Sequence, residues 1–332
     1  MTEPVLQVSD LTVRFNTDAG TVPAVNGVSF TLARGETLAM VGESGSGKSV
    51  TSLAIMRLTP PPPASTVQGR VVLRGNDGTP RELLALPEPA MRQMRGSRIA
   101  MIFQEPMTSL NPVLPIGEQV AEPIRYHRNA GRTAALAEAE RLLELVGIPE
   151  PRKRLASYPH QLSGGMRQRA MVAIALACDP DVLIADEPTT ALDVTVQAQI
   201  LELLKSLQAR TGMAMLFITH NLGVVAEIAD RVMVMYAGRV VEQAPLRRLF
   251  GTPLMPYTRG LLQSVPTLAA RHAALAAIPG NVPDPSNLPA GCAFTPRCPH
   301  ARPHICDAAL PALDAAEAEH LVRCARWREI AA

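Results

Sequence analysis

The sequence predicts an α/β fold with a mixed β-sheet, and three patterns support this prediction. The apolar run at 37–41 predicts a buried strand, and a glycine-rich loop and a helix follow it directly. Two more apolar runs, at 181–185 and 213–219, also predict buried strands. The alternating, β-forming residues at 5–15 and 27–32 predict antiparallel strands ahead of them.

Length and composition favour one large domain with a smaller appendage. The chain has 332 residues, of which 47% are apolar but only 3% aromatic, so we expect a core of aliphatic side chains. A net charge of +2, without blocks of like charge, lacks the electrostatic footprint of a nucleic-acid-binding protein. Residues 1–10 lack the apolar region of a signal peptide, and no apolar run approaches the roughly 18 residues of a membrane span. We therefore expect a soluble, cytosolic chain that serves a membrane only by docking onto other chains.

The loop after the strand at 37–41 carries the spacing G-x-x-x-x-G-K-[ST]. Its glycines, Gly42 and Gly47, let the backbone turn tightly and direct N–H groups at a phosphate. The N-terminus of the following helix adds a partial positive charge at the same place. Lys48 can reach the β- and γ-phosphates, and Ser49 offers a hydroxyl to Mg²⁺. The sequence therefore predicts a nucleotide-binding P-loop.

The elements around this loop follow from local signals. Phe15 ends the first alternating stretch, where it either stacks on an adenine or packs in the sheet. The prolines at 60–63 cannot continue a helix, so we expect them to end the helix at 50–58. The stretch 67–75 predicts another short strand.

Three predicted strands end in polar residues, and in open α/β sheets ligands lie beyond such strand ends. Gln104 follows the strand at 98–103, Asp186 and Glu187 follow 181–185, and His220 follows 213–219. Asp186 fits a carboxylate that binds Mg²⁺ directly or through water. Glu187 can face the γ-phosphate and polarise a water. Although a lone histidine is often structural, this position favours a phosphate contact for His220.

Helical stretches fill the remainder of the core. Residues 118–146 predict helix that is broken by Pro123, and 194–208 predict a further helix. The last core strands form a hairpin at 231–242.

A second anion site is predicted at Ser163, Gly164 and Gly165. These residues come directly before a helix that runs to about residue 178, so a hydroxyl and two glycine amides meet at a helix N-terminus. One chain with one P-loop has little use for two phosphate cradles. We therefore expect the second cradle to serve a nucleotide that another subunit holds.

These motifs, in this order and spacing, resemble the ATP-binding subunit of an ABC transporter over about residues 5–265. Residues 42–49 are similar to the Walker A motif, Gln104 to the Q-loop glutamine, 162–166 to the signature motif, Asp186 and Glu187 to Walker B with the catalytic glutamate, 191–193 to the D-loop, His220 to the switch histidine and Phe15 to the A-loop aromatic residue. The resemblance implies a P-loop ABC ATPase core that combines a mixed sheet, an antiparallel β subdomain and a helical subdomain at about 105–177. It also implies a head-to-tail dimer of ATPase subunits.

The resemblance further implies a set of site residues. ATP would be bound by Phe15, Gly42, Glu43, Ser44, Gly45, Ser46, Gly47, Lys48, Ser49, Val50, Gln104 and His220. The partner subunit's ATP would be contacted by Leu162, Ser163, Gly164, Gly165, Met166 and Asp193. Catalysis would rest on Glu187, His220, Lys48 and Gln104, and Mg²⁺ on Ser49, Gln104 and Asp186.

Finer similarity indicates the oligopeptide/dipeptide (peptide/nickel) importer branch. The stretches 104–112 and 185–193 fit that branch, and 253–258 resembles the start of its C-terminal extension, with Met255 where a histidine is common. The extension would also include the cysteine segment at 291–298. We therefore expect an ATP-binding domain at 1–250 and an extension at 251–332, which many prolines predict to be loop-rich.

Four of the five cysteines fall within the last 41 residues. Clustered thiols in a cytosolic chain indicate metal binding more than disulfides. The spacing of Cys292, Cys298, Cys306 and Cys324 lacks the close C-x₂-C pairs of ordinary zinc sites. Four thiolates can hold a [4Fe–4S] cluster, which the resemblance to some members implies, whereas zinc and unmetallated thiols stay open because spacing does not choose between metals.

The resemblance implies an ATPase that drives import of di- or oligopeptides from the cytoplasmic face of the inner membrane, where it would bind peripherally. Its partners would be a second, homologous ATPase subunit and two membrane permease subunits, with an extracytoplasmic solute-binding protein acting indirectly. The same machinery could import nickel or another small solute. A non-transport ABC ATPase is the more distant alternative, since the chain lacks the coiled coil, zinc insertion or second P-loop typical of that class.

Overall fold

The computed structural model describes residues 3–18, 20–75, 78–190, 192–264 and 277–331. The chain divides into two compact units, which we describe in turn. The first unit consists of Met1–Leu6, Leu32–Glu36 and Val72–Phe217, and the second of Gln7–Thr31, Thr37–Val71 and Ile218–Ala332. Across the described ranges, no helix combines the length and the apolar character needed to cross a membrane.

Parallel strands form the sheet of the first unit. Strand β6 (Ile99–Ile102) pairs with β7 (Val182–Asp186), and β8 (Ala214–Ile218) lies on the other side of β7. All their residues are buried, which explains why each strand is a nearly continuous apolar run in the sequence. In a different sheet, β5 (Pro80–Glu82) pairs antiparallel with the end of β4 (Ser65–Arg74).

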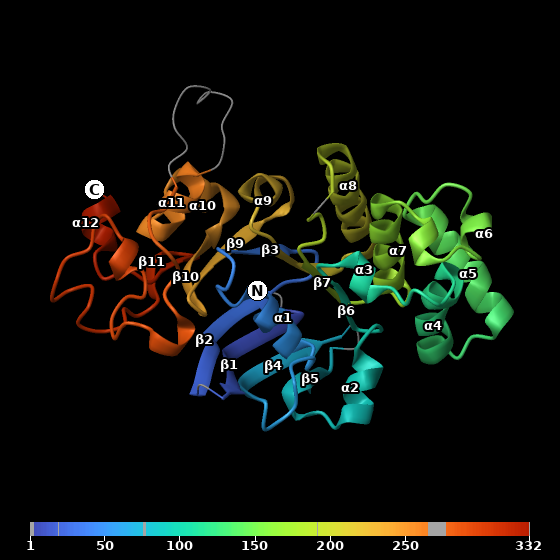
Figure 1. Cartoon of the computed structure of the whole chain (residues 1–332), viewed down its shortest axis with the longest axis horizontal. Coiled ribbons are helices and arrows are strands. Elements are labelled where there is room, and N and C mark those ends of the chain that lie inside the picture. Colours follow the sequence, from blue (N-terminus) through green and yellow to red (C-terminus); the bar gives the residue numbers. More distant parts are fainter. Residues whose placement is uncertain (1–2, 19, 76–77, 191, 265–276, 332) are drawn as a thin grey trace. The chain divides into compact units, whose positions relative to one another are not determined.

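Most of the first unit is helical. Helices α4, α5 and α7 pack side by side in Figure 1, with α6 close to α5. The helices are η1 (Leu83–Ala85), α2 (Glu88–Met94), α3 (Pro106–Ser109), α4 (Ile116–Arg128), α5 (Arg132–Leu145), α6 (Pro151–Arg154), η2 (Pro159–Gln161), α7 (Gly164–Leu176) and α8 (Val194–Thr211).

The predicted break at Pro123 is wrong. Helix α4 continues through Pro123 and ends at Asn129, which adopts a left-handed conformation with φ 52°, before α5 begins after Gly131. A proline inside a helix removes one backbone hydrogen bond, but an asparagine or glycine in the left-handed region ends the helix outright. The two helices therefore divide at the Asn129–Gly131 turn.

The second unit is built on a mixed sheet. Strand β3 (Thr37–Val41) pairs in parallel with β9 (Arg231–Tyr236), and β9 pairs antiparallel with β10 (Arg239–Pro245) across the predicted hairpin turn. Strands β1 (Leu6–Thr17) and β2 (Gly20–Leu32) lie next to each other, with β4 beside β1. These strands confirm that the alternating stretches at 5–15 and 27–32 form β-strands.

Helix α1 (Lys48–Ile55) follows β3 and the glycine-rich loop, as predicted, but it ends earlier than the prolines at 60–63. Met56 caps its C-terminus and Arg57 turns left-handed with φ 52°, so the chain has already left the helix before Pro60. The other helices of this unit are α9 (Leu222–Ile228), α10 (Leu246–Gly251), α11 (Pro256–Gln263), η4 (Pro285–Asn287), η5 (Thr295–Arg297) and α12 (Trp327–Ala331).

The described residues at 277–331 are mostly loop and turn, as the proline content predicts, but they also contain a pair of strands. Strands β11 (Asp314–Glu317) and β12 (His320–Val322) form an antiparallel pair, and β12 pairs with β10. Figure 1 shows β10 and β11 close together below α10 and α11. The core of the second unit also includes residues of this C-terminal segment. Phe294 and Val322 pack in one cluster with Val234 and Tyr236 of β9.

Candidate nucleotide site

The loop between β3 and α1 requires glycine at two positions. A Cβ atom on Gly42 would lie 2.3 Å from the backbone oxygen of Met235, and one on Gly47 would lie 2.6 Å from that of Ala24. Gly47 also has φ 98°, which other residues rarely adopt. The loop is thus held close to two neighbouring backbone segments.

Lys48 is held inside this loop. Its side chain is buried, and Nζ donates to the carbonyl oxygens of Gly42 at 2.8 Å and Glu43 at 3.0 Å. Ser46 Oγ lies 3.4 Å from the same nitrogen. A fixed ammonium group at the start of α1, together with the partial positive charge of the helix N-terminus, creates a positive potential that favours a phosphate group. Ser49 is the second residue of this helix.

The first unit brings Gln104 and Glu187 together. Gln104 Nε2 donates to Glu187 Oε2 at 3.3 Å, and the hydroxyl of Thr190 donates to the same oxygen at 2.8 Å. The preceding Asp186 is the last residue of β7 and is 4% exposed. The parallel pairing of β6 with β7 explains this meeting, because both strands end at the same edge of the sheet.

Glu187 carries backbone strain. Its φ of 47° lies in the left-handed region, which costs a residue with a side chain on the order of 1 kcal/mol. Such strain clusters at functional sites, where the surrounding structure fixes a side chain in one direction. Here the turn directs the carboxylate of Glu187 toward Gln104.

The turn at 162–166 caps helix α7. Ser163 Oγ accepts a hydrogen bond from the Met166 amide at 3.3 Å, while Gly164 and Gly165 form the first turn. A Cβ atom on Gly165 would lie 2.9 Å from Val196 of α8, so this glycine lets the two helices approach. The side chain of Leu162 is buried within the unit, and therefore only its backbone is available to a ligand.

Asp193 caps the next helix. Its Oδ1 accepts from the Val196 amide at 3.0 Å at the N-terminus of α8. Of the stretch that resembles the D-loop, Ala191 lies outside the described residues. Asp193 therefore has a structural role in addition to the partner contact predicted for it.

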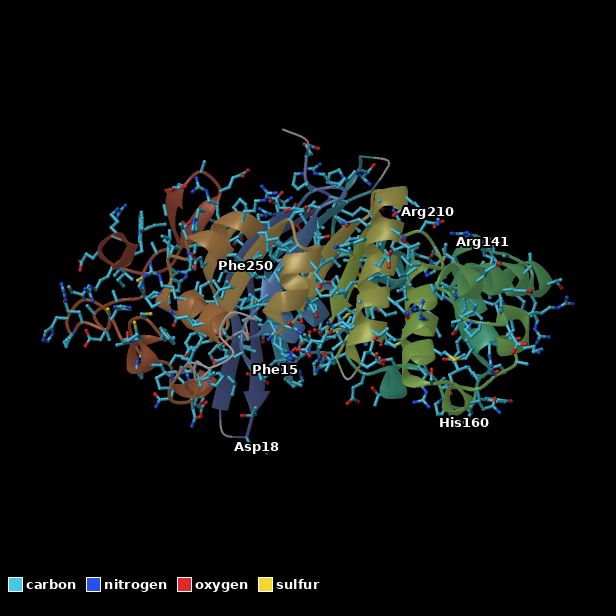
Figure 2. All side chains as sticks on the ribbon, turned by 90° about the horizontal axis from the view of Figure 1, so that it is seen from above. Phe15, Asp18, Arg141, His160, Arg210 and Phe250 are labelled. Atoms are coloured by element: carbon cyan, nitrogen blue, oxygen red, sulfur yellow. The ribbon has the colours of Figure 1, made fainter. Side chains whose placement is uncertain are left out.

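His220 and Phe15 both belong to the second unit, as does the loop at 42–49. His220 lies two residues beyond the end of β8 and is exposed, and Asn221 beside it caps α9 through its side chain. Phe15 is half-buried near the end of β1, and Figure 2 shows it near Asp18 at the end of that strand.

Sequence reasoning missed two residues that contact the loop. Arg297 forms a two-point ion pair with Glu43, with nitrogen–oxygen distances of 2.6 and 3.0 Å, and the Tyr257 hydroxyl accepts from the Glu43 amide at 2.9 Å. The Glu43 carboxylate raises the pKa of Arg297, and burial raises the pKa of Tyr257. Arg297 lies 254 residues from Glu43, so no local pattern pointed to this pair.

The four C-terminal cysteines line one small cavity, together with Phe294 and Thr295. Burial raises the pKa of Cys292 and Cys298 and raises that of Cys324 to about 11, so these thiols are protonated at neutral pH. Within the described ranges, no group of three or more histidine, cysteine or acidic side chains is arranged to hold a metal ion. The thiols therefore converge without forming a ready metal site.

Comparison with known families divides the chain into two matched regions. Residues 25–190 match the family described as ABC transporter, and residues 241–306 match the one described as oligopeptide/dipeptide transporter, C-terminal region. The first match contains the loop at 42–49, Gln104, Ser163 and Glu187, and the second contains Cys292, Arg297 and Cys306.

Relatives are similar over nearly the whole chain. A putative peptide import ATP-binding protein of Brucella melitensis is 55% identical over 336 residues, covering 99% of both chains. The dipeptide transport ATP-binding protein DppD of Bacillus subtilis is 52% identical, covering 97% of this chain and 94% of that one. Among solved structures, a dimeric ATP-binding cassette in a post-hydrolysis state with ADP and phosphate bound is 26% identical with a TM-score of 0.63, covering 73% of this chain and 99% of that one.

Proposed function

Because this chain belongs to the ABC transporter ATP-binding family, in the branch with the oligopeptide/dipeptide transporter C-terminal region, we propose that it hydrolyses ATP to drive the import of di- or oligopeptides. The observation that carries the proposal is the glycine loop with its buried Lys48, in a chain that is similar to peptide import ATP-binding proteins over almost its full length. Together they support ATP as the energy source and peptide import as the process that its hydrolysis drives.

The chemical roles follow from the groups that the two units present. Lys48 and the loop amides bind the β- and γ-phosphates, and His220 steadies the γ-phosphate. Glu187 orients or deprotonates the attacking water. The hydrogen bond from Gln104 and the left-handed backbone at Glu187 support this role, because both restrict where the carboxylate points.

Mg²⁺ is the cofactor that ATP brings. Ser49, Gln104 and Asp186 offer the oxygen atoms that this ion prefers. The carboxylate of Asp186 is buried, and a bound cation would offset its negative charge. When bound, the ion neutralises charge that develops on the transferring phosphate. We assign these three residues to hold it.

A second, homologous ATPase subunit completes the site. Support comes from the turn of Ser163, Gly164 and Gly165, which places the exposed Gly164 and the half-buried Gly165 at the N-terminus of the 13-residue helix α7. The solved relative with ADP and phosphate is also dimeric. In this proposal Ser163, both glycines, the Leu162 backbone, Met166 and Asp193 contact the partner's ATP.

The remaining partners are two membrane permease subunits, which the segment at about 105–160 contacts from the cytoplasmic face of the inner membrane. An extracytoplasmic solute-binding protein acts through them. Exposed apolar side chains at Val113, Leu114 and Tyr126 support a docking role for this segment. Nickel or another small solute is the alternative cargo, and stimulation of the ATPase by each cargo in the full assembly distinguishes them.

Replacement of the Glu187 carboxylate tests the proposal. We expect Glu187→Gln to lower ATP turnover at least about 100-fold while ATP still binds, because the amide cannot accept the proton of water. The variant should accumulate as an ATP-bound dimer in size-exclusion chromatography. Glu138→Gln, which changes a half-buried glutamate paired with Arg141 on α5, is the matched control. Rapid turnover by Glu187→Gln would refute the assigned role.

A [4Fe–4S] cluster at the four cysteines is the finer proposal for the extension. Its support is their convergence on one cavity, but binding must first displace the protons of these half-buried thiols. A brown colour that Cys298→Ser removes would support the cluster. Colourless protein that contains zinc, or no metal, would refute it.

A further inference from the structure

Glu43 is an unexpected residue for a loop that binds phosphate. It follows Gly42 directly, and its carboxylate is 28% exposed on its side chain. ATP carries several negative charges, and a carboxylate beside its phosphates repels them. The loop therefore needs a group that neutralises Glu43 or turns it away.

Arg297 supplies that group from the C-terminal segment. Its side chain is only 5% exposed, and its guanidinium donates to both carboxylate oxygens of Glu43. The remaining donors reach the Tyr236 hydroxyl at 3.4 Å and the carbonyl oxygens of Pro279 at 2.9 Å and Ile278 at 3.3 Å. All five N–H groups of the guanidinium are thus used, which fixes its position.

Three buried aromatic rings support the pair. Tyr236, Tyr257 and Phe294 pack with centroids 4.6 to 5.4 Å apart. The guanidinium carbon of Arg297 lies 5.9 Å from the centre of the Tyr236 ring and 6.0 Å from that of Phe294. The Tyr257 hydroxyl also accepts a hydrogen bond from the Glu43 amide. The C-terminal segment therefore contacts both the backbone and the side chain of this one loop residue.

We propose that Arg297 is a positioning residue of the nucleotide site, which acts through Glu43. By pairing with this carboxylate, Arg297 neutralises a charge that would repel the phosphates. It also fixes the position of Glu43, whose carbonyl oxygen accepts a hydrogen bond from Lys48. Affinity for ATP then depends on the C-terminal segment, and ATP in turn stabilises that segment, because coupling between two sites is reciprocal. The inference rests on the proposed function, since it requires that the loop binds ATP.

A set of full-length variants tests it through ATP affinity and the split between KM and kcat. We expect Arg297→Gln to raise the Kd and KM for MgATP about tenfold with kcat changed less than about twofold, because the unpaired Glu43 carboxylate then opposes binding. Arg297→Lys should be intermediate, since it keeps the charge but loses the two-point contact. Adding Glu43→Gln to Arg297→Gln should return the Kd to within about threefold of the wild type.

Arg259→Gln is the matched control. Arg259 belongs to the same C-terminal segment and bonds the carbonyl oxygens of Pro253 and Ile330, so its loss weakens the segment without exposing Glu43. The inference is overturned if Arg259→Gln weakens ATP binding as much as Arg297→Gln, if Arg297→Gln has the wild-type Kd, or if Glu43→Gln gives no rescue. Wild-type protein that does not bind ATP would instead refute the proposed function.

Hydrogen exchange provides a test that does not require a stable Arg297 variant. In the wild type, MgATP should slow exchange at 292–298 as well as in the loop at 42–49, whereas in Glu43→Gln it should protect the loop alone. Protection of the loop without any change at 292–298 in the wild type would refute the coupling.

Discussion

At the scale of single residues, the sequence motifs predicted chemistry where the relevant contacts are local. The loop at 42–49 was evident because its spacing, strand and helix are contiguous, and the pairing of β6 with β7 then explains why Gln104 meets Glu187. The pair of Glu43 and Arg297 was not predictable, because it depends on how a distant segment packs. Long-range charge pairs leave no periodic signal in a sequence.

The close approach at Gly42 leads to a first prediction. Gly42→Ala should raise the Kd for ATP at least about tenfold, because a Cβ atom 2.3 Å from the Met235 oxygen displaces the loop from β9. Equilibrium binding of a fluorescent ATP analogue measures the change. Gly251→Ala, where a Cβ atom meets nothing within 4 Å, should bind normally. Wild-type affinity in Gly42→Ala would show that the loop tolerates the shift.

A second residue prediction concerns Cys324, whose pKa burial raises to about 11 from a usual value of 9.0. As the pH rises above 9, the unfolded chain loses this proton first, so the thiol should reduce stability between pH 9 and 11. In metal-free protein, alkylation of Cys324 by iodoacetamide should reach half its maximal rate near pH 11. The same thiol in urea should do so near pH 9. Equal profiles in both states would contradict the burial effect.

At the scale of helices and strands, periodicity predicted which elements exist more reliably than where they end. Helix α4 passes through Pro123 and stops at Asn129, and α1 stops before the proline run. In both cases a left-handed residue ends the helix, and that conformation is set by the packed turn. Strand β11 was missed because Asp314–Glu317 is short and lacks β-branched residues.

Two substitutions of Asp193 can distinguish its role as the cap of α8 from a role in ATP hydrolysis. Asp193→Ala should lower the free energy of unfolding by roughly 0.5–2 kcal/mol, because the Val196 amide loses its acceptor. Asp193→Asn should be close to wild type in urea denaturation, since asparagine caps equally well. A loss of ATPase activity in Asp193→Asn would then report a role of the carboxylate beyond capping. Equal destabilisation by both variants would refute the cap assignment.

At the scale of the molecule, the second unit depends on its C-terminal segment. The fold class was predictable because the motifs are specific, but the addition of β12 to the sheet was not. Glu242 of β10 is fully buried and accepts from the amides of Leu254 and Met255, and it pairs with His320 at 2.8 Å. One carboxylate therefore joins β10, the start of α11 and β12.

Removing this carboxylate should destabilise the second unit. We expect Glu242→Ala to lower the free energy of unfolding by roughly 3–5 kcal/mol, because it leaves two amides and the buried His320 ring without their acceptor. Glu317→Ala, which breaks an exposed pair with Arg248, should cost less than about 1 kcal/mol. Urea titration of both variants measures the difference, and a small effect at Glu242 would contradict the central role of this residue.

The pairing of β10 with β12 also determines when the edge of β10 is covered during synthesis of the chain. Val322 and Leu321 sit opposite Glu242 and Gln243, so one edge of β10 gains this partner only when the last part of the chain leaves the ribosome. At 5–20 residues per second, the stretch from β10 to β12 takes on the order of ten seconds to make. During that interval the edge carries unpaired backbone groups and can recruit strands of other nascent chains. A ribosome that stalls between β10 and β12 therefore leaves an aggregation-prone product.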